Sequence, residues 1–203
     1  MMAVTEYHDY WNRDNGNETR ILNYPLNENS WIIELGGFEG WFTEKAYNKF
    51  NCNILSIEPV FCDALNNKFQ NVEKVKIECL GISDEKKVIS LFIDGDATTQ
   101  YSQISNYTKE ITCQPLEYFL EKYNIEKIDL IQVNIEGEEY PLLEKWITSD
   151  VLNRIHFLQI QYHDFVPDYR SRKEKIEKGL IERGFENVWD YDVVFTSWKN
   201  KNF

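Results

Sequence analysis

Two carboxylates and a cluster of glycines have the types and spacing expected for chemistry on a bound ligand. Glu34 closes an apolar run and stands two residues before Gly36, and Gly40 follows four residues later. Glycine at such a turn lets the backbone approach a ligand without an intervening Cβ atom. A dinucleotide fingerprint would need a glycine in place of Leu35 as well. An acid at this point therefore favours a positively charged ligand over a pyrophosphate.

A second carboxylate, Glu58, closes the next apolar run and is followed by Pro59. An acid near this spacing can accept hydrogen bonds from both hydroxyls of a ribose. S-adenosylmethionine joins a ribose to an ammonium group and a sulfonium, so Glu34 and Glu58 together predict this nucleoside as the ligand. The alternative is a tight turn beside an ordinary exposed acid, which fits either half of the pattern better than it fits both.

Polar residues alternate along two later apolar runs, 128–135 and 155–162. A central parallel strand is usually apolar on both faces, and alternate side chains share a face. If the two strands are neighbours, their polar residues form a trough that leads to the carboxyl edge of the sheet; alternatively, each strand shows one face to water. The polar residues are Gln132, Asn134 and Glu136 in the first run and Gln159, Gln161 and His163 in the second.

The polar trough also contains candidates for a general base. Methyl transfer to a hydroxyl requires a positioned acceptor and a group that takes its proton. His163 is the first candidate, because the ordinary pKa of histidine lies near working pH, although a structural role is equally open to it. Glu136 and Asp164 are the alternatives. Glu138 and Glu139 are expected at the start of the following helix, where acids complement the helix dipole.

Strands and helices alternate from Ser30 onward, and these elements must position the polar groups. The alternation predicts an α/β domain over residues 30–203, with a mainly parallel sheet covered on both faces and an antiparallel C-terminal hairpin. Residues 1–29 are expected to form a helical flank or lid. Strands are expected at 31–35, 53–58, 75–82, 87–93, 128–135, 155–162, 187–191 and 193–198. Helices are expected after Gly40, over 61–69, after Pro115, around 143–147 and up to Gly184.

The composition restricts the class of partner. A formal charge of −12 over 203 residues argues against nucleic acid, since binding to phosphates relies on Lys and Arg, and it disfavours an anionic membrane surface. No basic segment followed by an apolar one opens the sequence, and no run approaches the ~18 apolar residues of a membrane span. We therefore expect a cytoplasmic protein with a small-molecule or neutral partner, unless the acidity serves solubility alone.

The four cysteines show no CxxC spacing, and a domain of this length does not need disulfides for stability. We expect them to be reduced core residues rather than disulfide partners or metal ligands, and no metal site is predicted. They are Cys52, Cys62, Cys79 and Cys113.

Three blocks of the sequence resemble the FkbM-type methyltransferases, which use S-adenosylmethionine. The resemblance runs from about Tyr24 to Trp198, and its most specific part is the E-G-x-E that follows a strand. The blocks are ELGGFEGWF at 34–42, IEP at 57–59 and IDLIQVNIEGEEY at 128–140; QIQYHDF at 159–165 and VFTSWK at 194–199 resemble one branch of the family.

The resemblance implies a Rossmann-like class I methyltransferase fold with seven strands in three layers. It also implies O-methylation of a hydroxyl on a sugar, glycan or natural product. The aromatic residues Tyr7, Tyr10, Trp11 and Trp198 could stack on such an acceptor or pack on their own domain. The implied cofactor residues are Glu34, Gly36, Gly37 and Gly40 at the methionine end, Glu58 and Pro59 at the ribose, Ile82 and Ser83 near the adenine, and Asn134 beside them.

Four positions depart from the family pattern, which commonly has Asp at 34, Asn at 38, Lys at 132 and Asp at 134. The last two charges are lost together, as if a buried ion pair had become the amide pair Gln132 and Asn134. Asn134 cannot act as a base or as an anionic metal ligand. One alternative is therefore a degenerate methyltransferase fold that acts as a binding subunit. Another is a metal-dependent glycosyltransferase with Asp94 and Asp96 as ligands, although Asp94-Gly95-Asp96 also suits a hairpin turn.

Overall fold

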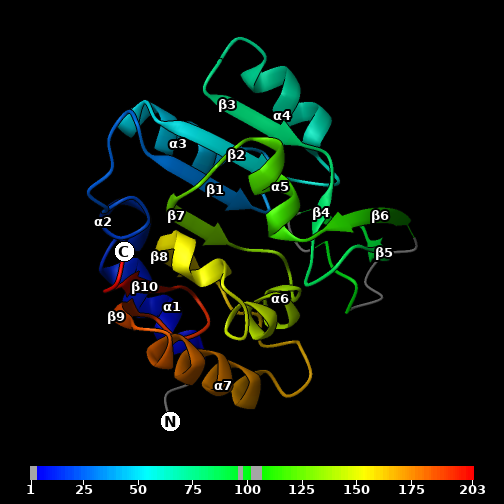
Figure 1. Cartoon of the computed structure of the whole chain (residues 1–203). Coiled ribbons are helices and arrows are strands. Elements are labelled where there is room, and N and C mark those ends of the chain that lie inside the picture. Colours follow the sequence, from blue (N-terminus) through cyan, green and yellow to red (C-terminus); the bar gives the residue numbers. More distant parts are fainter. Residues whose placement is uncertain (1–3, 96–97, 102–106) are drawn as a thin grey trace.

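The computed structural model describes residues 4–95, 98–101 and 107–203 and has three layers (Figure 1). Its central sheet is parallel except for β10 (Thr196–Asn200), which runs antiparallel to both of its neighbours, β8 and β9. The predicted α/β fold with a C-terminal antiparallel hairpin is thereby confirmed. Within the described chain the sheet has seven strands, in the order β3 (Val75–Glu78), β2 (Asn53–Ile57), β1 (Trp31–Leu35), β7 (Ile128–Val133), β8 (Ile155–Ile160), β10 (Thr196–Asn200) and β9 (Phe185–Asp190).

Helices cover both faces of this sheet, as alternating β and α units require. One face buries apolar side chains of α5 (Leu116–Lys122), α6 (Glu139–Trp146) and α7 (Tyr169–Glu182). The opposite face is covered by α1 (Val4–Arg13), the short α2 (Gly16–Thr19), α3 (Trp41–Phe50) and α4 (Cys62–Phe69). A single 3₁₀ turn, η2 (Val151–Arg154), leads into β8.

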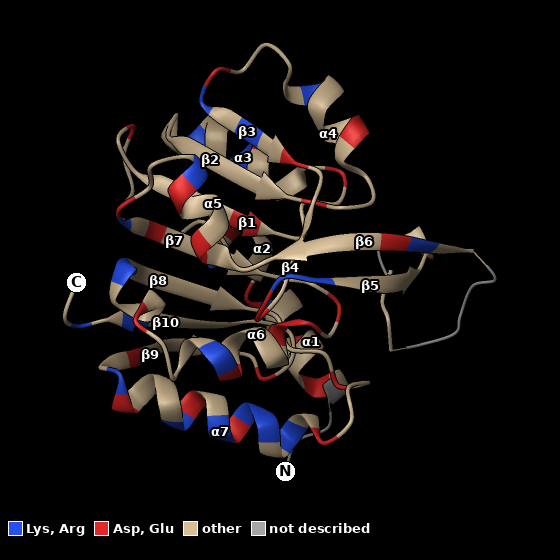
Figure 2. Ribbon diagram, turned by 45° about the vertical axis from the view of Figure 1, so that its right-hand side comes forward, with Lys and Arg blue, Asp and Glu red and all other residues tan. Residues whose placement is uncertain are grey.

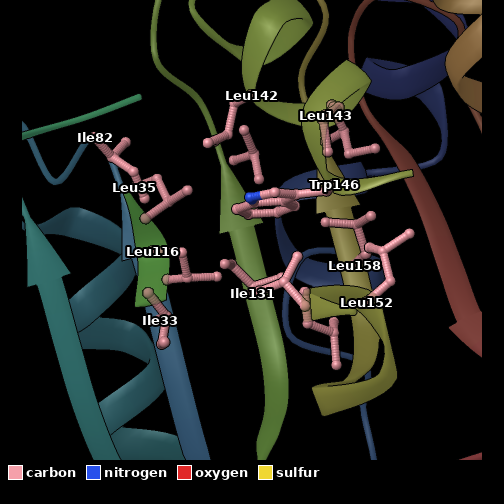
Figure 3. Close-up of a cluster of buried hydrophobic side chains, with 14 of the residues drawn as sticks. Ile33, Leu35, Ile82, Leu116, Ile131, Leu142, Leu143, Trp146, Leu152 and Leu158 are labelled. Carbon is pink, nitrogen blue, oxygen red and sulfur yellow. The ribbon is translucent and has the colours of Figure 1, made fainter. Parts of the chain in front are cut away.

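The central strands are apolar on both faces, which explains why they lie in the middle of the molecule. On β1, Ile33 faces the cluster of α5 and α6, whereas Ile32 faces the cluster of α3. Figure 3 shows the indole of Trp146 lying between Ile131 of β7 and Leu158 of β8, under its own helix. This packing fixes β7 and β8 relative to α6, and the loops at the carboxyl ends of these strands carry the candidate site.

A small second sheet lies beside the carboxyl edge of the main one. Its strands are β4 (Gly81–Ile82), β6 (Thr108–Gln114) and β5 (Lys87–Phe92), in that spatial order, and Figure 2 shows β5 and β6 projecting away from the main sheet. The prediction of one strand over 75–82 is wrong, because the chain leaves β2 after Glu78 and pairs again with β6 at Gly81. Asp94 and Gly95 lie in the turn that follows β5, and Asp96 lies outside the described residues.

Two of the cysteines form a disulfide, which corrects the expectation that all four are reduced. Cys62 opens α4 and Cys79 directly follows β3, and their Cα atoms lie 5.2 Å apart because α4 packs on β3. Cys79 is also exposed rather than in the core. Cys52 and Cys113 are free and buried, as expected.

The N-terminal residues pack on the C-terminal strands. The Trp11 ring lies 5.1 Å from the Tyr191 ring and 5.5 Å from the Phe195 ring, and Tyr24 Oη shares a hydrogen bond of 2.8 Å with Ser197 Oγ. Trp11 and Trp198 are buried, so these two aromatic side chains pack on their own domain and are not open to an acceptor. No helix in the described part of the chain is long and apolar enough to cross a membrane.

Candidate active site

The turn after β1 needs glycine at its first position. Gly36 has a φ of 86°, and a Cβ atom there would lie 1.9 Å from the backbone oxygen of Asn134. Any side chain would therefore push β1 and β7 apart at their carboxyl ends. Phe38, where the family commonly has Asn, also has a positive φ, 44°, a region in which asparagine is common and bulky residues are rare.

Glu34 lies behind this turn, not among the described residues that line the cavity beyond it. Its Oε2 accepts hydrogen bonds of 2.5 Å from the hydroxyls of Thr43 and Ser56. Burial raises the pKa of Glu34 to about 7; the two hydroxyls counteract this rise, and the nearby charge of Glu58 adds to it. The structure therefore gives Glu34 a supporting place under the glycine turn, in contrast to the direct cofactor contact that the sequence implied.

Glu58 is fixed at the cavity by three backbone N–H groups. Its Oε1 accepts hydrogen bonds from Val60 N at 2.7 Å and Phe61 N at 3.1 Å, and its Oε2 accepts one from Phe38 N at 3.0 Å. A carboxylate has about four acceptor positions, so Oε2 retains capacity for a ligand hydroxyl. Because Glu58 lines the cavity, its orientation suits the predicted contact with a ribose.

A cavity of about 350 Å³ opens at the carboxyl ends of β1, β2 and β7, the usual place for a ligand in an open α/β sheet. Its polar wall comes from the main sheet, and its apolar wall comes from the small sheet. The polar lining includes Gly36, Glu58, Asn134, Glu136, Glu138 and Gln161; the apolar lining includes Phe38, Phe61, Ile82, Ile89, Leu91 and Ile111.

Asn134 presents an unused acceptor at this cavity. Its Oδ1 is buried and has no hydrogen-bond partner among the residues that the structure describes. Buried polar atoms are nearly always paired, so this oxygen fits a donor supplied by a bound ligand. Gln132 and Gln159 lie side by side in the register of β7 and β8, which confirms that the two polar stripes are on neighbouring strands. Gln159 is fully buried and donates to Ile21 O and Tyr24 Oη, so the stripe is covered by the N-terminal segment and does not face water.

His163 is held between two carboxylates. Its Nδ1 lies 3.0 Å from Glu139 Oε1, and its Nε2 lies 3.2 Å from Glu136 Oε1. Burial alone would lower the pKa of His163, but the two carboxylates outweigh it and raise the pKa to about 10. An imidazolium has no lone pair to take a proton. This arrangement favours a positioning role for His163 over the predicted role of base, and it leaves Glu136 as the predicted base that lines the cavity.

Glu139 and Glu138 have roles that their sequence position did not reveal. Glu139 does open α6, as expected, but it is fully buried and accepts hydrogen bonds from Gly137 N and His163 N. Glu138 lines the cavity, accepts a hydrogen bond from Ser83 Oγ and lies 3.3 Å from Lys87 Nζ. In the sequence, Glu138 was marked only by its place in the E-G-x-E block. Its contact with Lys87 could not be predicted, because Lys87 belongs to β5 of the separate small sheet.

The structure thus brings together half of the residues predicted for the site. Asp164 is exposed and has no place in the cavity wall. Gly37 and Gly40 pack against side chains of β2 and α4, and Ser83 supports Glu138. The predicted residues that line the cavity are Gly36, Glu58, Pro59, Ile82, Asn134 and Glu136, and those that do not are Glu34, Gly37, Gly40, Ser83, His163 and Asp164.

Comparison with known proteins agrees with this geometry. The sequence pattern of the Methyltransferase FkbM domain matches residues 27–186, well over half of the chain. The chain belongs to this family. The methyl donor of this FkbM domain is S-adenosylmethionine, and the match leaves no basis for the glycosyltransferase alternative. A search of curated protein sequences finds no match.

Solved structures share the fold of the FkbM domain at low sequence identity. The METTL16 methyltransferase domain is 10% identical with a TM-score of 0.51, over 97% of this chain and 66% of that one. A SAM-dependent O-methyltransferase from Thermotoga maritima is 10% identical with a TM-score of 0.50, over 93% of this chain and 64% of that one. Such similarity supports the class I methyltransferase fold and says nothing about the acceptor.

Proposed function

We propose that this FkbM domain transfers the methyl group of S-adenosylmethionine to a hydroxyl of a sugar, glycan or natural product, with Glu136 as the base. The observation that carries the proposal is the cavity itself. One side of it presents the fixed carboxylate Glu58 and the unused oxygen of Asn134. Glu136 lies on the same cavity, and its side chain is 22% exposed.

The residues of the cavity fit the donor. Glu58 Oε2 would accept a hydrogen bond from a ribose hydroxyl, and the orphaned Asn134 Oδ1 would accept one from the ammonium group. Gly36 lines the cavity and, because it has no Cβ atom, lets the carboxyl ends of β1 and β7 close together beneath the ligand. Ile82, Ile89 and Leu91 supply an apolar wall for the adenine. When bound, S-adenosylmethionine supplies a methyl group that an aligned nucleophile can attack.

Glu136 is the group placed to receive the acceptor's proton. As the new C–O bond forms, the hydroxyl loses its proton to a base within hydrogen-bond reach, and the products are a methyl ether and S-adenosylhomocysteine. His163 keeps its own proton and holds the Glu136 carboxylate, while Glu139 holds His163 from the other side. In this scheme His163 and Glu139 are positioning residues, and their value lies in fixing Glu136 before the acceptor arrives.

The proposal is tested by binding and turnover measured on the same variants. We expect Glu58→Ala to weaken S-adenosylmethionine binding by ~1.5–3 kcal/mol in calorimetry, the range for hydrogen bonds to a charged group. Glu39→Ala is the matched control, because Glu39 is an exposed acid in the same turn. Glu136→Gln should keep cofactor affinity and lose most transfer of labelled methyl to a panel of sugars, glycans and alcohols. Unchanged affinity in Glu58→Ala, or full turnover in Glu136→Gln, contradicts the respective role.

A binding subunit without catalysis is the second candidate function. It is favoured by Phe38, whose bulky side chain occupies a left-handed turn position and meets Phe61 edge-on at 5.0 Å on the cavity wall. Tight binding of S-adenosylmethionine with no transfer to any acceptor, including after Phe38→Asn, would favour this candidate. Cytoplasmic location and the absence of nucleic-acid and membrane partners stay predictions from the sequence.

A further inference from the structure

One exposed aromatic side chain lies beside His163, the residue that holds the proposed base. Phe165 is 43% exposed, and its ring lies 5.2 Å from the His163 ring and 6.5 Å from the Tyr101 ring. His163 in turn contacts Glu136. The Phe165 ring does not line the cavity itself, but it is two contacts away from the Glu136 carboxylate that does.

Tyr101 continues this surface toward Glu138. A Cβ atom on Gly137 would lie 2.5 Å from the Tyr101 ring, so the ring rests against the backbone of the E-G-x-E block. Tyr101 Oη lies 3.5 Å from Glu138 Oε1. The two rings thus flank the two cavity carboxylates that follow β7.

Charges around the rings exclude an anionic ligand. Glu136, Glu138 and the exposed Asp164 supply negative charge on this side. The cations nearby are engaged with carboxylates: His163 with Glu136 and Glu139, Lys87 with Asp84 and Glu138, and Arg172 with Glu144 at 2.8 and 3.0 Å. A ligand carboxylate or phosphate placed against Phe165 would meet this like charge, and the three cations named here are already paired with carboxylates.

Three other exposed aromatic side chains, which do not line the cavity, have a charged or ring neighbour stacked on them. Arg13 lies over Tyr10 at 4.5 Å and Lys45 over Trp41 at 4.6 Å, and His156 stacks on Phe203 at 4.6 Å. Phe165 differs because its neighbours are the positioning histidine and a ring that contacts Glu138. Exposing a phenyl ring to water is unfavourable, and a ligand with an apolar face that covers the ring removes part of this cost.

We propose that Phe165, with Tyr101 beside it, is the platform on which the acceptor binds, and that the acceptor is an uncharged, hydroxylated six-membered ring. The axial and ring C–H groups of such a ring form an apolar face that stacks on the phenyl group, while its hydroxyls point to Glu136 and Gln161. This inference rests on the proposed methyl transfer and adds the residue that selects the acceptor.

Saturation-transfer NMR on protein loaded with S-adenosylhomocysteine tests the platform directly. The neutral probes are methyl α-D-glucopyranoside, methyl α-D-galactopyranoside, methyl α-L-rhamnopyranoside and myo-inositol; the charged probe is methyl α-D-glucopyranosiduronate. We expect ring C–H signals from at least one neutral probe and none from the charged one. Phe165→Ala should reduce the signal roughly five- to tenfold, as loss of an aromatic contact predicts, and Phe165→Tyr should restore it. Phe203→Ala, which removes an exposed ring elsewhere, should leave it unchanged.

The outcomes separate this inference from the proposed function. Calorimetry with S-adenosylhomocysteine checks that Phe165→Ala is folded and keeps the cofactor site. Binding of S-adenosylhomocysteine without signal from any neutral ring overturns the platform, and so does an equal signal in native protein and Phe165→Ala. Methyl transfer to an acyclic alcohol that does not depend on Phe165 would leave the proposed function standing and overturn the platform alone. Failure to bind S-adenosylhomocysteine would overturn both.

Discussion

The two sides of the cavity satisfy their carboxylates in different ways. On the side of β1 and β2, Glu34 is held by two hydroxyls and Glu58 by three backbone N–H groups. On the side of β7 and β8, Glu136 and Glu139 hold His163, and Glu138 holds Lys87. Neutral donors stabilise a carboxylate without cancelling its charge, whereas a cation cancels it.

This difference matches the two partners of a methyl transfer. On the β1–β2 side, Glu58 keeps a negative charge that no cation compensates among the contacts described. Such a charge acts strongly on a nearby cation in a low-dielectric site, and it therefore suits a donor with an ammonium and a sulfonium. On the β7–β8 side the cations His163 and Lys87 fix the orientation of the carboxylates, which suits a base that must not move, and the negative charge that remains suits an uncharged acceptor. The same pattern, an acid at the end of a strand, thus has two physical meanings that depend on its hydrogen-bond donors.

The largest expected effect comes from removing the cation on the β7–β8 side. His163→Ala leaves Glu139 buried without its charged partner, and loss of one member of a buried pair costs about 3–5 kcal/mol. Urea unfolding at pH 7 measures this loss of stability. Because the folded pKa of His163, about 10, is above the ordinary 6.5, its contribution is complete below pH 6.5 and disappears as the pH rises through 10. The difference between native protein and variant should shrink over that range.

His156→Ala is the matched control for this prediction. His156 is half-buried and stacks on Phe203, and burial lowers its pKa, so it supplies no buried cation at pH 7. A His163→Ala variant that loses no more stability than His156→Ala would show that the β7–β8 side does not depend on its ion pairs. The comparison between the two sides would then fail.

The second effect concerns a covalent link on the β2–β3 side. The Cys62–Cys79 disulfide spans 17 residues of sequence, and closing a loop of this size in the unfolded chain stabilises the folded state by about 3 kcal/mol. Cys62→Ser with Cys79→Ser should lower the free energy of unfolding by this amount, and added reductant should lower that of native protein but not that of the double variant. Equal stability of native protein and variant in the absence of reductant would mean that the pair is not bonded.

The parts of the molecule that follow from local sequence signals were predictable. The glycine turn at Gly36 and the acid at Glu58 are readable because their spacing sets a turn and a strand end, and apolar runs gave the main sheet. The disulfide, the separate strand at Gly81 and the charge of His163 were not readable. Each depends on residues far apart in the chain, such as Glu139 and His163, that meet only when β8 lies beside β7 and α6 packs over them. Phe165 closes the QIQYHDF block, but its exposure is a property of the fold that the block does not reveal.

The smallest expected effect is the pH dependence of stability caused by Glu34, a carboxyl group held by neutral hydroxyls and not by a cation. Burial raises the pKa of Glu34 to about 7 from 4.5, so between these values the native state keeps a proton that the unfolded state has lost. The unfolding free energy therefore falls as the pH rises through this window, by up to about 1.4 kcal/mol per pH unit for one proton. The Glu34→Gln variant has no titrating carboxyl group at this position in either the folded or the unfolded state. Between pH 5.5 and 6.5 the unfolding free energy of the native protein should fall by about 1 kcal/mol more than that of the variant. Parallel pH profiles would show that Glu34 is ionised throughout this range. The binding of a positively charged ligand near the Gly36 turn would then not be coupled to the loss of a proton from Glu34.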